Sequence, residues 1–317
     1  MISQEKKQNQ MSDKLRIGTR GSALALAQAK SVASLLKKAG AASEIEIVAI
    51  KTSGDRAKAK PAATGIFTKE IEKALLRGKV DLAVHSMKDL PTMLAEGLCI
   101  AAVPERLNPL DVLVARDGGR LEELKPGATA GTGSPRRRAQ ILARRADLRV
   151  VPLRGNLDTR LRKVREGEID CAVLAMAGLM RLGRASEASE ILIGEFMLPA
   201  PGQGALAVEA RSDDGRVLEI VRAINHPDSL NEVTAERALL RATGAGCRAP
   251  LGALARIDGG RLVLKAVVLD ADGKRRCEVR EEGIPPDAEE IGKRAAEVLI
   301  EKGAGELIKS ARAGTKE

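Results

Sequence analysis

One short segment brings several reactive side chains together. His85–Asp89 contains an imidazole, a hydroxyl, an ammonium and a carboxylate, and it follows a stretch with the character of a buried strand. In an open parallel sheet, ligands bind beyond the carboxyl ends of the strands, so Asp89 is placed to act as a general acid or base. The alternative is that Lys88 and Asp89 form an ordinary surface ion pair. The spacing alone leaves both interpretations open.

A second reactive group is the thiol of Cys247, which lies in the glycine-rich segment 244–248 beside an arginine. Glycine neighbours expose the sulfur, and a nearby cation favours the nucleophilic thiolate. The other cysteines, Cys99, Cys171 and Cys277, are far apart in the sequence, and we expect each to be a small buried hydrophobic residue. Cys247 is therefore the candidate nucleophile.

Three turns carry residues that suit the binding of anions. Gly131–Arg137 is rich in glycine and contains a serine-proline pair that predicts the start of a helix, where free N–H groups attract anions. Arg154–Asn156, followed by Arg160, forms a second strand-to-helix turn of this type. Arg20 and Ser22 form a similar turn near the N-terminus.

The positive charge of the chain is concentrated around two of these turns. The chain carries 53 Lys and Arg against 43 Asp and Glu, a net charge of +10. From Ser134 to Arg165, ten arginines and one lysine face only two aspartates, which gives +9 in 32 residues. A solvated basic surface would explain such a run. The predominance of arginine, which binds carboxylate or phosphate oxygens two at a time, favours a site for a polyanionic ligand.

The composition excludes several classes of function. With no Trp, no Tyr and two Phe, the chain lacks the rings on which single-stranded nucleic acids stack. Common nucleotide-binding glycine motifs and the HExxH motif are absent, and with two histidines we expect no metal site. No apolar run reaches the ~18 residues of a membrane-spanning helix, and no signal peptide is visible. We expect a cytoplasmic protein with reduced thiols.

Alternating strand and helix patterns predict two α/β halves and a smaller α+β domain. The first half has strands at 15–18, 44–50 and 79–85 and helices at 23–39 and 68–76. The second has strands at 112–115, 128–131, 148–153 and 170–174 and helices at 135–145 and 157–166. The third has a helix at 230–242, strands at 251–257, 261–269 and 275–282, and a last helix that starts at Asp287 with a capping box to Glu290.

These patterns divide the chain into three domains. We expect the first to combine residues 14–104 with 203–224, the second to contain residues 109–199, and the third to contain residues 227–312. Since β-α-β units build parallel sheets, the first two domains are expected to have parallel sheets.

Seven motifs, collinear from about Leu15 to Leu307, resemble the porphobilinogen deaminase family, also called hydroxymethylbilane synthases. They are Arg20–Ser22, Gly65–Glu70, His85–Pro91, Gly131–Arg137, Leu153–Asn156, Pro201–Ala205 and Gly246-Cys247. The resemblance implies an α/β fold with two domains like type II periplasmic binding proteins and a small C-terminal α+β domain that bears the cofactor loop.

The resemblance also implies an activity. Members are transferases that condense four porphobilinogen molecules head to tail, with loss of ammonia, into hydroxymethylbilane for tetrapyrrole and haem synthesis. Their cofactor, dipyrromethane, would be attached through a thioether to Cys247, and their catalytic aspartate falls on Asp89. Positions that match cofactor or substrate contacts are Arg20, Ser22, Phe67, Lys88, Thr132, Ser134, Arg136, Arg137, Arg154, Gly155, Arg160, Arg181 and Gln203. The family suggests a monomer, with porphobilinogen and neither nucleic acid nor membrane as its partner.

Three positions depart from the family pattern. Ser53 stands where some members have an arginine, Thr64 where many have a lysine, and Gly133 where a serine is common. Each change affects an individual carboxylate contact, and the first two bear on the segment 56–64. Asp89 and Cys247 are retained.

Two other functions remain open from the residues alone. A non-catalytic receptor for small anions would also have two α/β lobes and a basic cleft, but it would release no ammonia and need no Cys247. A duplex nucleic-acid binder that uses the arginine-rich segment would show strongly salt-dependent affinity. A covalent adduct on Cys247 would distinguish the transferase from both.

Overall fold

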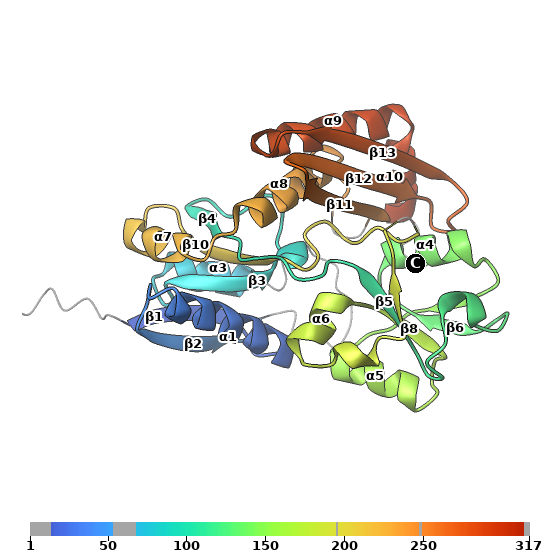
Figure 1. The fold of residues 1–317 in the computed structure, drawn as a ribbon, viewed down its shortest axis with the longest axis horizontal. Coiled ribbons are helices and arrows are strands. Elements are labelled where there is room, and N and C mark those ends of the chain that lie inside the picture. The colour runs from blue at the N-terminus through green and yellow to red at the C-terminus, as the bar shows by residue number, and fades with distance from the viewer. Residues whose placement is uncertain (1–13, 53–67, 195, 247–248, 314–317) are drawn as a thin grey trace, which may run out of the picture.

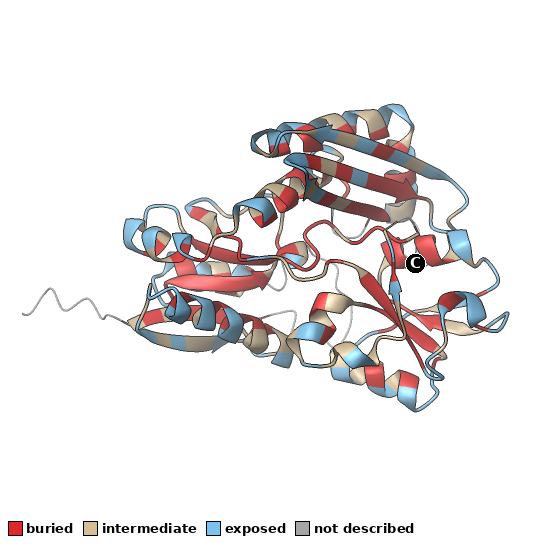
Figure 2. Ribbon diagram, in the orientation of Figure 1, coloured by how far each residue is buried: buried red, intermediate tan, exposed pale blue. Residues whose placement is uncertain are grey.

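The computed structural model describes residues 14–52, 68–194, 196–246 and 249–313. This part of the chain forms three β-sheets, each accompanied by helices (Figure 1). Buried residues are concentrated in the strands and on the helix faces that pack against them (Figure 2). The core consists mainly of Leu, Val, Ile and Ala, as a chain nearly free of aromatic residues requires.

The first sheet has the strand order β2-β1-β3-β10-β4. Its elements are β1 (Lys14–Arg20), α1 (Ala23–Lys38), β2 (Glu44–Ile50), α3 (Lys69–Leu76), β3 (Leu82–Ser86), β4 (Leu98–Ala102), β10 (Leu206–Arg211) and α7 (Gly215–Arg222). β1, β2 and β3 run parallel, and β10 lies antiparallel between β3 and β4. Helices α1 and α7 pack on one face of the sheet and α3 on the other.

The second sheet repeats this arrangement with the order β7-β6-β8-β5-β9. Its elements are β5 (Asp111–Ala115), β6 (Thr129–Gly131), α4 (Pro135–Arg144), β7 (Arg149–Val151), α5 (Leu157–Arg165), β8 (Cys171–Ala175), α6 (Met176–Arg181) and β9 (Glu190–Leu192). β6, β7 and β8 run parallel, and β5 lies antiparallel between β8 and β9. In each sheet, therefore, the strand that enters from the other half is antiparallel to its neighbours.

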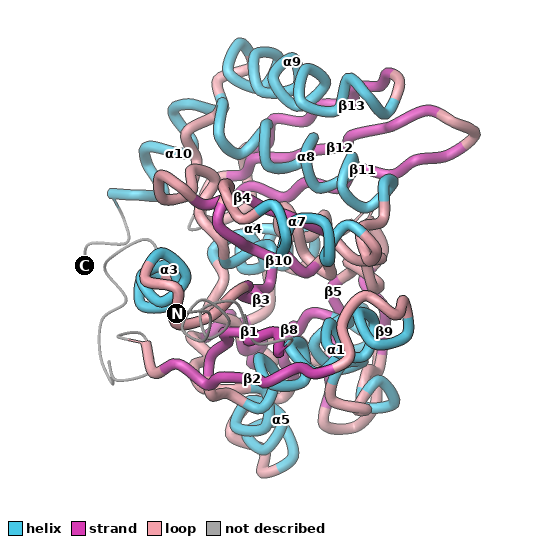
Figure 3. Tube along the Cα trace, turned by 90° about the vertical axis from the view of Figure 1, so that its left-hand side faces the viewer, coloured by secondary structure: helices cyan, strands magenta, loops and turns pink. Residues whose placement is uncertain are grey.

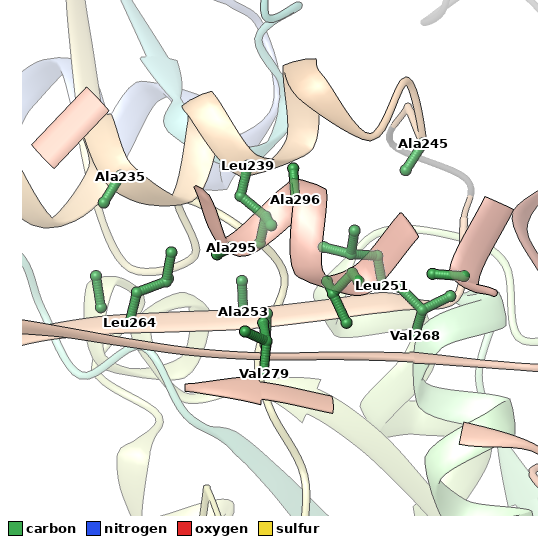
Figure 4. Close-up of a cluster of buried hydrophobic side chains, with 14 of the residues drawn as sticks. Ala235, Leu239, Ala245, Leu251, Ala253, Leu264, Val268, Val279, Ala295 and Ala296 are labelled. Atoms are coloured by element: carbon green, nitrogen blue, oxygen red, sulfur yellow. The ribbon is translucent and has the colours of Figure 1, made fainter. Parts of the chain in front are cut away.

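The third sheet is a three-stranded antiparallel meander. Its elements are α8 (Pro227–Ala242), β11 (Leu251–Asp258), β12 (Arg261–Leu269), β13 (Arg276–Gly283), α9 (Ala288–Glu301) and α10 (Ala304–Ala313). Figure 4 shows its aliphatic core, in which Leu239 of α8 and Ala296 of α9 lie over Leu264 and Val279 of the sheet. Figures 1 and 3 both place this region at one end of the molecule, above the other two sheets.

Helices α1, α4 and α5 each begin directly after a residue whose side chain caps the helix N-terminus. The side chain of Ser22 accepts a hydrogen bond from the Ala25 N–H at the start of α1. Ser134 caps α4 in the same way, with a proline in the first turn, and Asn156 caps α5. These caps satisfy N–H groups that have no partner within the helix, so the three helix starts are set by neighbouring residues.

Two connections join the first and second sheets. The first, residues 103–110, leads from β4 to β5, and the second, residues 193–205, leads from β9 to β10. One buried ion pair, between Arg106 and Glu236, contacts both connections. In the first connection, the Arg106 guanidinium donates to both carboxylate oxygens of Glu236 on α8, at 2.8 and 3.0 Å. Its Nε donates to the backbone oxygen of Gln203 in the second connection, at 2.9 Å. Glu236 also accepts the Gly202 N–H at 2.6 Å. Gly202 has φ +75°, and a Cβ there would lie 2.6 Å from Met87, so the second connection needs glycine at this point.

The predicted fold class is confirmed, because two α/β domains with the same strand order precede a small α+β domain. The expectation of purely parallel sheets was wrong, since β10 and β5 are antiparallel. The sequence patterns also missed β4, β9, β10, α6, α7 and α10, and α10 rather than the helix predicted from Asp287 is the last of the described helices. The predicted capping box at Asp287 was wrong: its side chain makes no cap hydrogen bond, and a 3₁₀ turn, Pro285–Asp287, precedes α9.

No helix in the described ranges has the length and apolar character needed to cross a membrane.

Candidate active site

A cavity of about 1250 Å³ lies between the first two sheets. It is lined by the segments that follow the carboxyl ends of β1, β3, β6 and β7, and by part of α6. The Gly202–Ala205 connection also lines it, together with Pro250 and Ala271 near the third sheet. Ligands bind at such strand ends in open α/β sheets, because the loops there converge while the strands hold them rigid.

The cavity is strongly cationic. Its described lining contains seven basic residues, which are Arg20, Lys88, Arg137, Arg138, Arg154, Arg160 and Arg181. Two acidic residues line it, Asp89 and Asp158, and Asp158 is paired with Arg184. The excess of guanidinium groups suits a ligand with several carboxylates.

The loop after β3 places Asp89 at the cavity. Met87–Asp89 forms a single 3₁₀ turn, with Met87 buried as an anchor and Asp89 exposed. Lys88 lies half-buried beside it, and its ammonium donates to Gln203 Oε1 at 3.1 Å. Burial and the charge of Arg137 lower the pKa of Lys88 to about 8, against the opposing effect of Asp89 and Asp111. A carboxylate ligand near Lys88 would therefore stabilise its charged form.

The turn before α4 supplies hydroxyl and backbone groups. Thr132 is buried and its Oγ1 accepts the Ser134 N–H at 3.2 Å, while Ser134 Oγ accepts the Arg137 N–H at 3.4 Å. Both residues line the cavity, as does Gly133. A Cβ at Gly133 would lie 3.1 Å from the backbone oxygen of Leu153, so a serine at this position would press on the neighbouring turn.

Asp111, at the start of β5, is a fully buried carboxylate that accepts hydrogen bonds from three of the predicted ligand contacts. Its Oδ2 accepts Arg136 Nη1 at 2.7 Å, and its Oδ1 accepts Arg137 Nη2 at 2.7 Å. Gln203 Nε2 also donates to Oδ1, at 2.8 Å. Burial acts to raise the pKa of Asp111, but the two guanidinium charges hold it well below its usual range. Asp111 is therefore an anion in the folded protein.

The three residues that bond to Asp111 differ in whether they reach the cavity. Arg136 is buried and is not part of the cavity lining; its Nη1 also donates to the backbone oxygen of Leu198. Arg137, which is bonded to the same Asp111 carboxylate, does line the cavity. The Gln203 amide spans the two halves, because it bonds to Lys88 on one side and to Asp111 on the other.

Two further cations lie around the start of α5, Arg154 in the turn before it and Arg160 in the helix itself. Arg154 is exposed at the cavity, and Arg160 Nε donates to the backbone oxygen of Gly155 at 2.9 Å. Gly155 has φ +106°, which an L side chain rarely adopts. Burial and the charge of Arg137 lower the pKa of Arg160, with Asp89 acting in the opposite direction. Arg160 is thus within electrostatic reach of Asp89.

The remaining predicted contacts come from the first strand and from α6. Arg20 and Ser22 line the cavity at the end of β1. Arg181 Nη2 donates to the backbone oxygen of Gly204 at 2.7 Å, which ties α6 to the second connection, and burial lowers the pKa of Arg181 to about 10. Cys247 and Phe67 lie outside the described residues, as do the departures at 53 and 64.

The arginine-rich segment divides into two groups. Four of its eleven basic residues line the cavity: Arg137, Arg138, Arg154 and Arg160. Others pair with acidic side chains away from the cavity, as Arg144 does with Glu122, Arg145 with Asp147, and Arg165 with Glu187. The charge run therefore serves both a site and a solvated, ion-paired surface.

Family profiles and relatives of known sequence point to the same family over most of the chain. A family profile described as "Porphobilinogen deaminase, dipyromethane cofactor binding domain" matches residues 15–219, and "Porphobilinogen deaminase, C-terminal domain" matches residues 230–301. The porphobilinogen deaminase of Pelotomaculum thermopropionicum is 51% identical over 306 residues, covering 95% of this chain and 98% of the relative. That of Thermus thermophilus is 49% identical over 297 residues, covering 93% and 98%.

Solved structures similar to this chain include a methionine-binding protein and a VFT2 domain. The methionine-binding protein MetQ has a TM-score of 0.43 and 13% identity, covering 71% of this chain and 95% of that one. The VFT2 domain of Bordetella pertussis BvgS has a TM-score of 0.41 and 15% identity, covering 67% and 86%. The family profiles and the near full-length relatives identify the chain as a member of the porphobilinogen deaminase family.

Proposed function

We propose that Cys247 and Asp89 carry the covalent chemistry of this protein. The protein is a hydroxymethylbilane synthase: a transferase that condenses porphobilinogen with loss of ammonia in tetrapyrrole biosynthesis. Its family profile is that of a dipyrromethane-binding protein. The assignment of particular residues to the cofactor and to proton transfer is our inference.

The charge of the cavity is the observation that carries this proposal. Each pyrrole of the cofactor, substrate and product bears two carboxylates, so the bound chain becomes more anionic with every condensation. Seven basic residues face this space, with Asp89 as its one acidic residue free of an ion pair in the described lining. Those cations fit dipyrromethane as a donor set, since guanidinium binds carboxylate in a bidentate manner.

We infer distinct roles for the chain's own groups. Arg20, Arg137, Arg154, Arg160 and Arg181 would hold ligand carboxylates, with Ser22, Thr132 and Ser134 as hydroxyl donors. When bound, dipyrromethane supplies the pyrrole carbon to which the first porphobilinogen is joined. The Asp89 carboxylate would stabilise the cation left when ammonia departs and accept the proton from the pyrrole carbon.

The thioether to Cys247 is part of the proposal. Gly246 and Ala249 flank the undescribed pair, and Pro250, three positions after Cys247, lines the cavity. Cys247 is therefore only three positions in the sequence from a residue of the cavity wall. The Lys88, Gln203 and Phe67 assignments rest on the family motifs, and the Gln203 amide already bonds to Lys88 and Asp111.

We also propose a cytoplasmic monomer without a nucleic-acid partner. The domain boundaries predicted from sequence, 14–104 with 203–224, 109–199 and 227–312, remain our proposal. They are supported by the two connections, which run between the first and second sheets, and by the separate core of the third.

The test of Asp89 is its isosteric replacement by Asp89→Asn. We expect turnover to fall by about 10²–10⁴-fold, the usual contribution of a general acid or base, while the cofactor still assembles. Asp158→Asn, in the same cavity but on a residue paired with Arg184, should retain most activity. Turnover in Asp89→Asn close to that of Asp158→Asn would remove Asp89 from the mechanism.

A further inference from the structure

A buried imidazole–carboxylate pair lies directly beneath the Asp89 loop. His85 is in β3, and its Nε2 is 2.9 Å from Glu209 Oε2 on the neighbouring strand β10. The His85 side chain is 5% exposed and that of Glu209 is 0% exposed. Glu209 Oε1 is buried with no hydrogen-bond partner among the described residues. A buried carboxylate with one bonded oxygen depends heavily on that bond, so Glu209 fixes the orientation of the ring.

His85 also lines a small cavity, and Asp89 lines the same cavity. This cavity measures about 70 Å³ and is lined by His85, Asp89, Ser86, Gln28 and Thr68, among others. A water molecule needs about 10–15 Å³ on such a measure, so the space can hold a short water chain. Gln28 Nε2 donates to Ser86 Oγ at 2.7 Å, and this bond joins two residues of the cavity wall. No described residue bonds to the second ring nitrogen, Nδ1.

Each condensation leaves one proton to be removed. When porphobilinogen enters with its aminomethyl group as an ammonium, the C–N bond breaks and its electron pair leaves on ammonia. A free pyrrole carbon then forms the new C–C bond and loses its hydrogen as a proton, so the products are the longer chain, ammonia and one proton. With Asp89 as the acceptor, the carboxylate must be deprotonated again before the next round.

We propose that His85 receives this proton from Asp89 through the small cavity and that Glu209 positions His85 for this task. The proposal rests on the proposed role of Asp89. The order Glu209–imidazole–cavity is the arrangement in which a carboxylate orients a histidine and stabilises its imidazolium form. Relay to a second base would free Asp89 between the four condensations, while the growing anionic chain occupies the main cavity. The imidazolium of His85 would then pass its proton through the water-filled small cavity to the released ammonia or to solvent, so that His85 is neutral again before the next round.

Charged groups lie on both sides of the pair. Asp89 and Arg20 line the small cavity together with His85, and Lys88 lines the main cavity. On the far side, Glu209 is near Cys99 of β4 and Arg237 of α8, whose guanidinium donates to the backbone oxygens of Leu90 and Pro91. Burial raises the pKa of the Cys99 thiol, with Glu209 adding to the effect, so Cys99 does not compete for this proton.

The first test reads protonation directly and needs no turnover. The chain has two histidines, so ¹⁵N-histidine labelling of the full-length protein gives one reporter and one internal control. In neutral His85 we expect the hydrogen on Nε2, donated to Glu209. The pH titration of the His85 signals should move in Asp89→Asn and in Glu209→Gln, while His226, which caps α8, should not change. A hydrogen on Nδ1, or a titration indifferent to Asp89→Asn, would overturn the relay.

The second test reads turnover. His85→Ala should lose about tenfold or more in kcat with unchanged cofactor loading by intact mass, and added imidazole should restore part of it. His226→Asn, which keeps a capping side chain, should show neither effect. Full activity in His85→Ala refutes the relay. A loss that imidazole does not restore, together with a lower unfolding midpoint, assigns the pair a structural role instead. If the wild-type protein releases no ammonia from porphobilinogen, the proposed function fails. The ¹⁵N experiment still shows whether His85 donates to Glu209 and responds to Asp89.

Discussion

Replacing Asp111 by asparagine tests whether one buried charge assembles the cationic side of the site. The carboxylate accepts hydrogen bonds from Arg136, Arg137 and Gln203. In Asp111→Asn the amide oxygen can still serve Arg137 and Gln203, but the amide NH₂ then meets the Arg136 guanidinium, donor against donor. Arg136 keeps the backbone oxygen of Leu198 as its remaining partner.

The expected cost follows from the burial of this cluster. Removing one partner of a buried ion pair typically costs about 3–5 kcal/mol, because the remaining charge has no compensation. We expect a loss of this size in the free energy of unfolding, measured by urea titration at pH 7. Asp147→Asn is the control, since Asp147 pairs with Arg145 at the surface, and its unfolding midpoint should change little.

The pH dependence adds a second readout. The pKa of Asp111 in the folded protein is held below its usual value of 3.8, so its stabilising effect is present above that pH and is lost as the pH falls. The difference between wild type and Asp111→Asn should therefore be largest near neutral pH and narrow below about pH 4. If Asp111→Asn costs no more than Asp147→Asn at pH 7, the reasoning is refuted.

Three further outcomes are expected. Since the pKa of Lys88 is about 8, its side chain is largely a neutral amine above that pH, and cofactor binding there should draw a proton onto this amine. Calorimetry in buffers of different ionisation enthalpy detects the uptake, Lys88→Met should abolish it, and equal uptake in the variant would contradict this. Gly202→Ala should destabilise the protein by at least about 1–2 kcal/mol because φ is positive there, whereas Gly215→Ala, which meets open space, should not, and equal unfolding midpoints would refute it. Arg160→Leu should raise KM by about 10–100-fold, the value of a charge-assisted contact, compared with little change in Arg149→Leu outside the cavity lining.

The parts of the fold that could be predicted from sequence are those set by neighbouring residues. The helix starts at Ser22, Ser134 and Asn156 follow from side chains that cap N–H groups three residues on. By contrast, β9 has three residues, too few for a periodic pattern to show. The antiparallel direction of β10 depends on a connection from the other half, which no local pattern encodes.

The residues of the candidate site also fall into those that could be predicted from sequence and those that could not. The Asp89 loop and both arginine-bearing turns could be found because their residues are contiguous, and the structure brings them to one cavity. Asp111 and Glu209 could not, because their partners lie 25 and 124 residues away in the sequence. The only sequence signal for either is a single acidic residue in a largely apolar strand. The composition likewise could not tell which cations of the charge run face the cavity.

The most direct test of the central claim is the intact mass of the full-length protein, produced in cells that make porphobilinogen. Our account predicts a mass above that of the bare chain by two linked porphobilinogen units, with the adduct on the peptide that contains Cys247 and absent from Cys247→Ser. Addition of porphobilinogen should then extend the adduct one unit at a time. A wild-type mass equal to the bare chain, or an adduct that persists in Cys247→Ser, would contradict it.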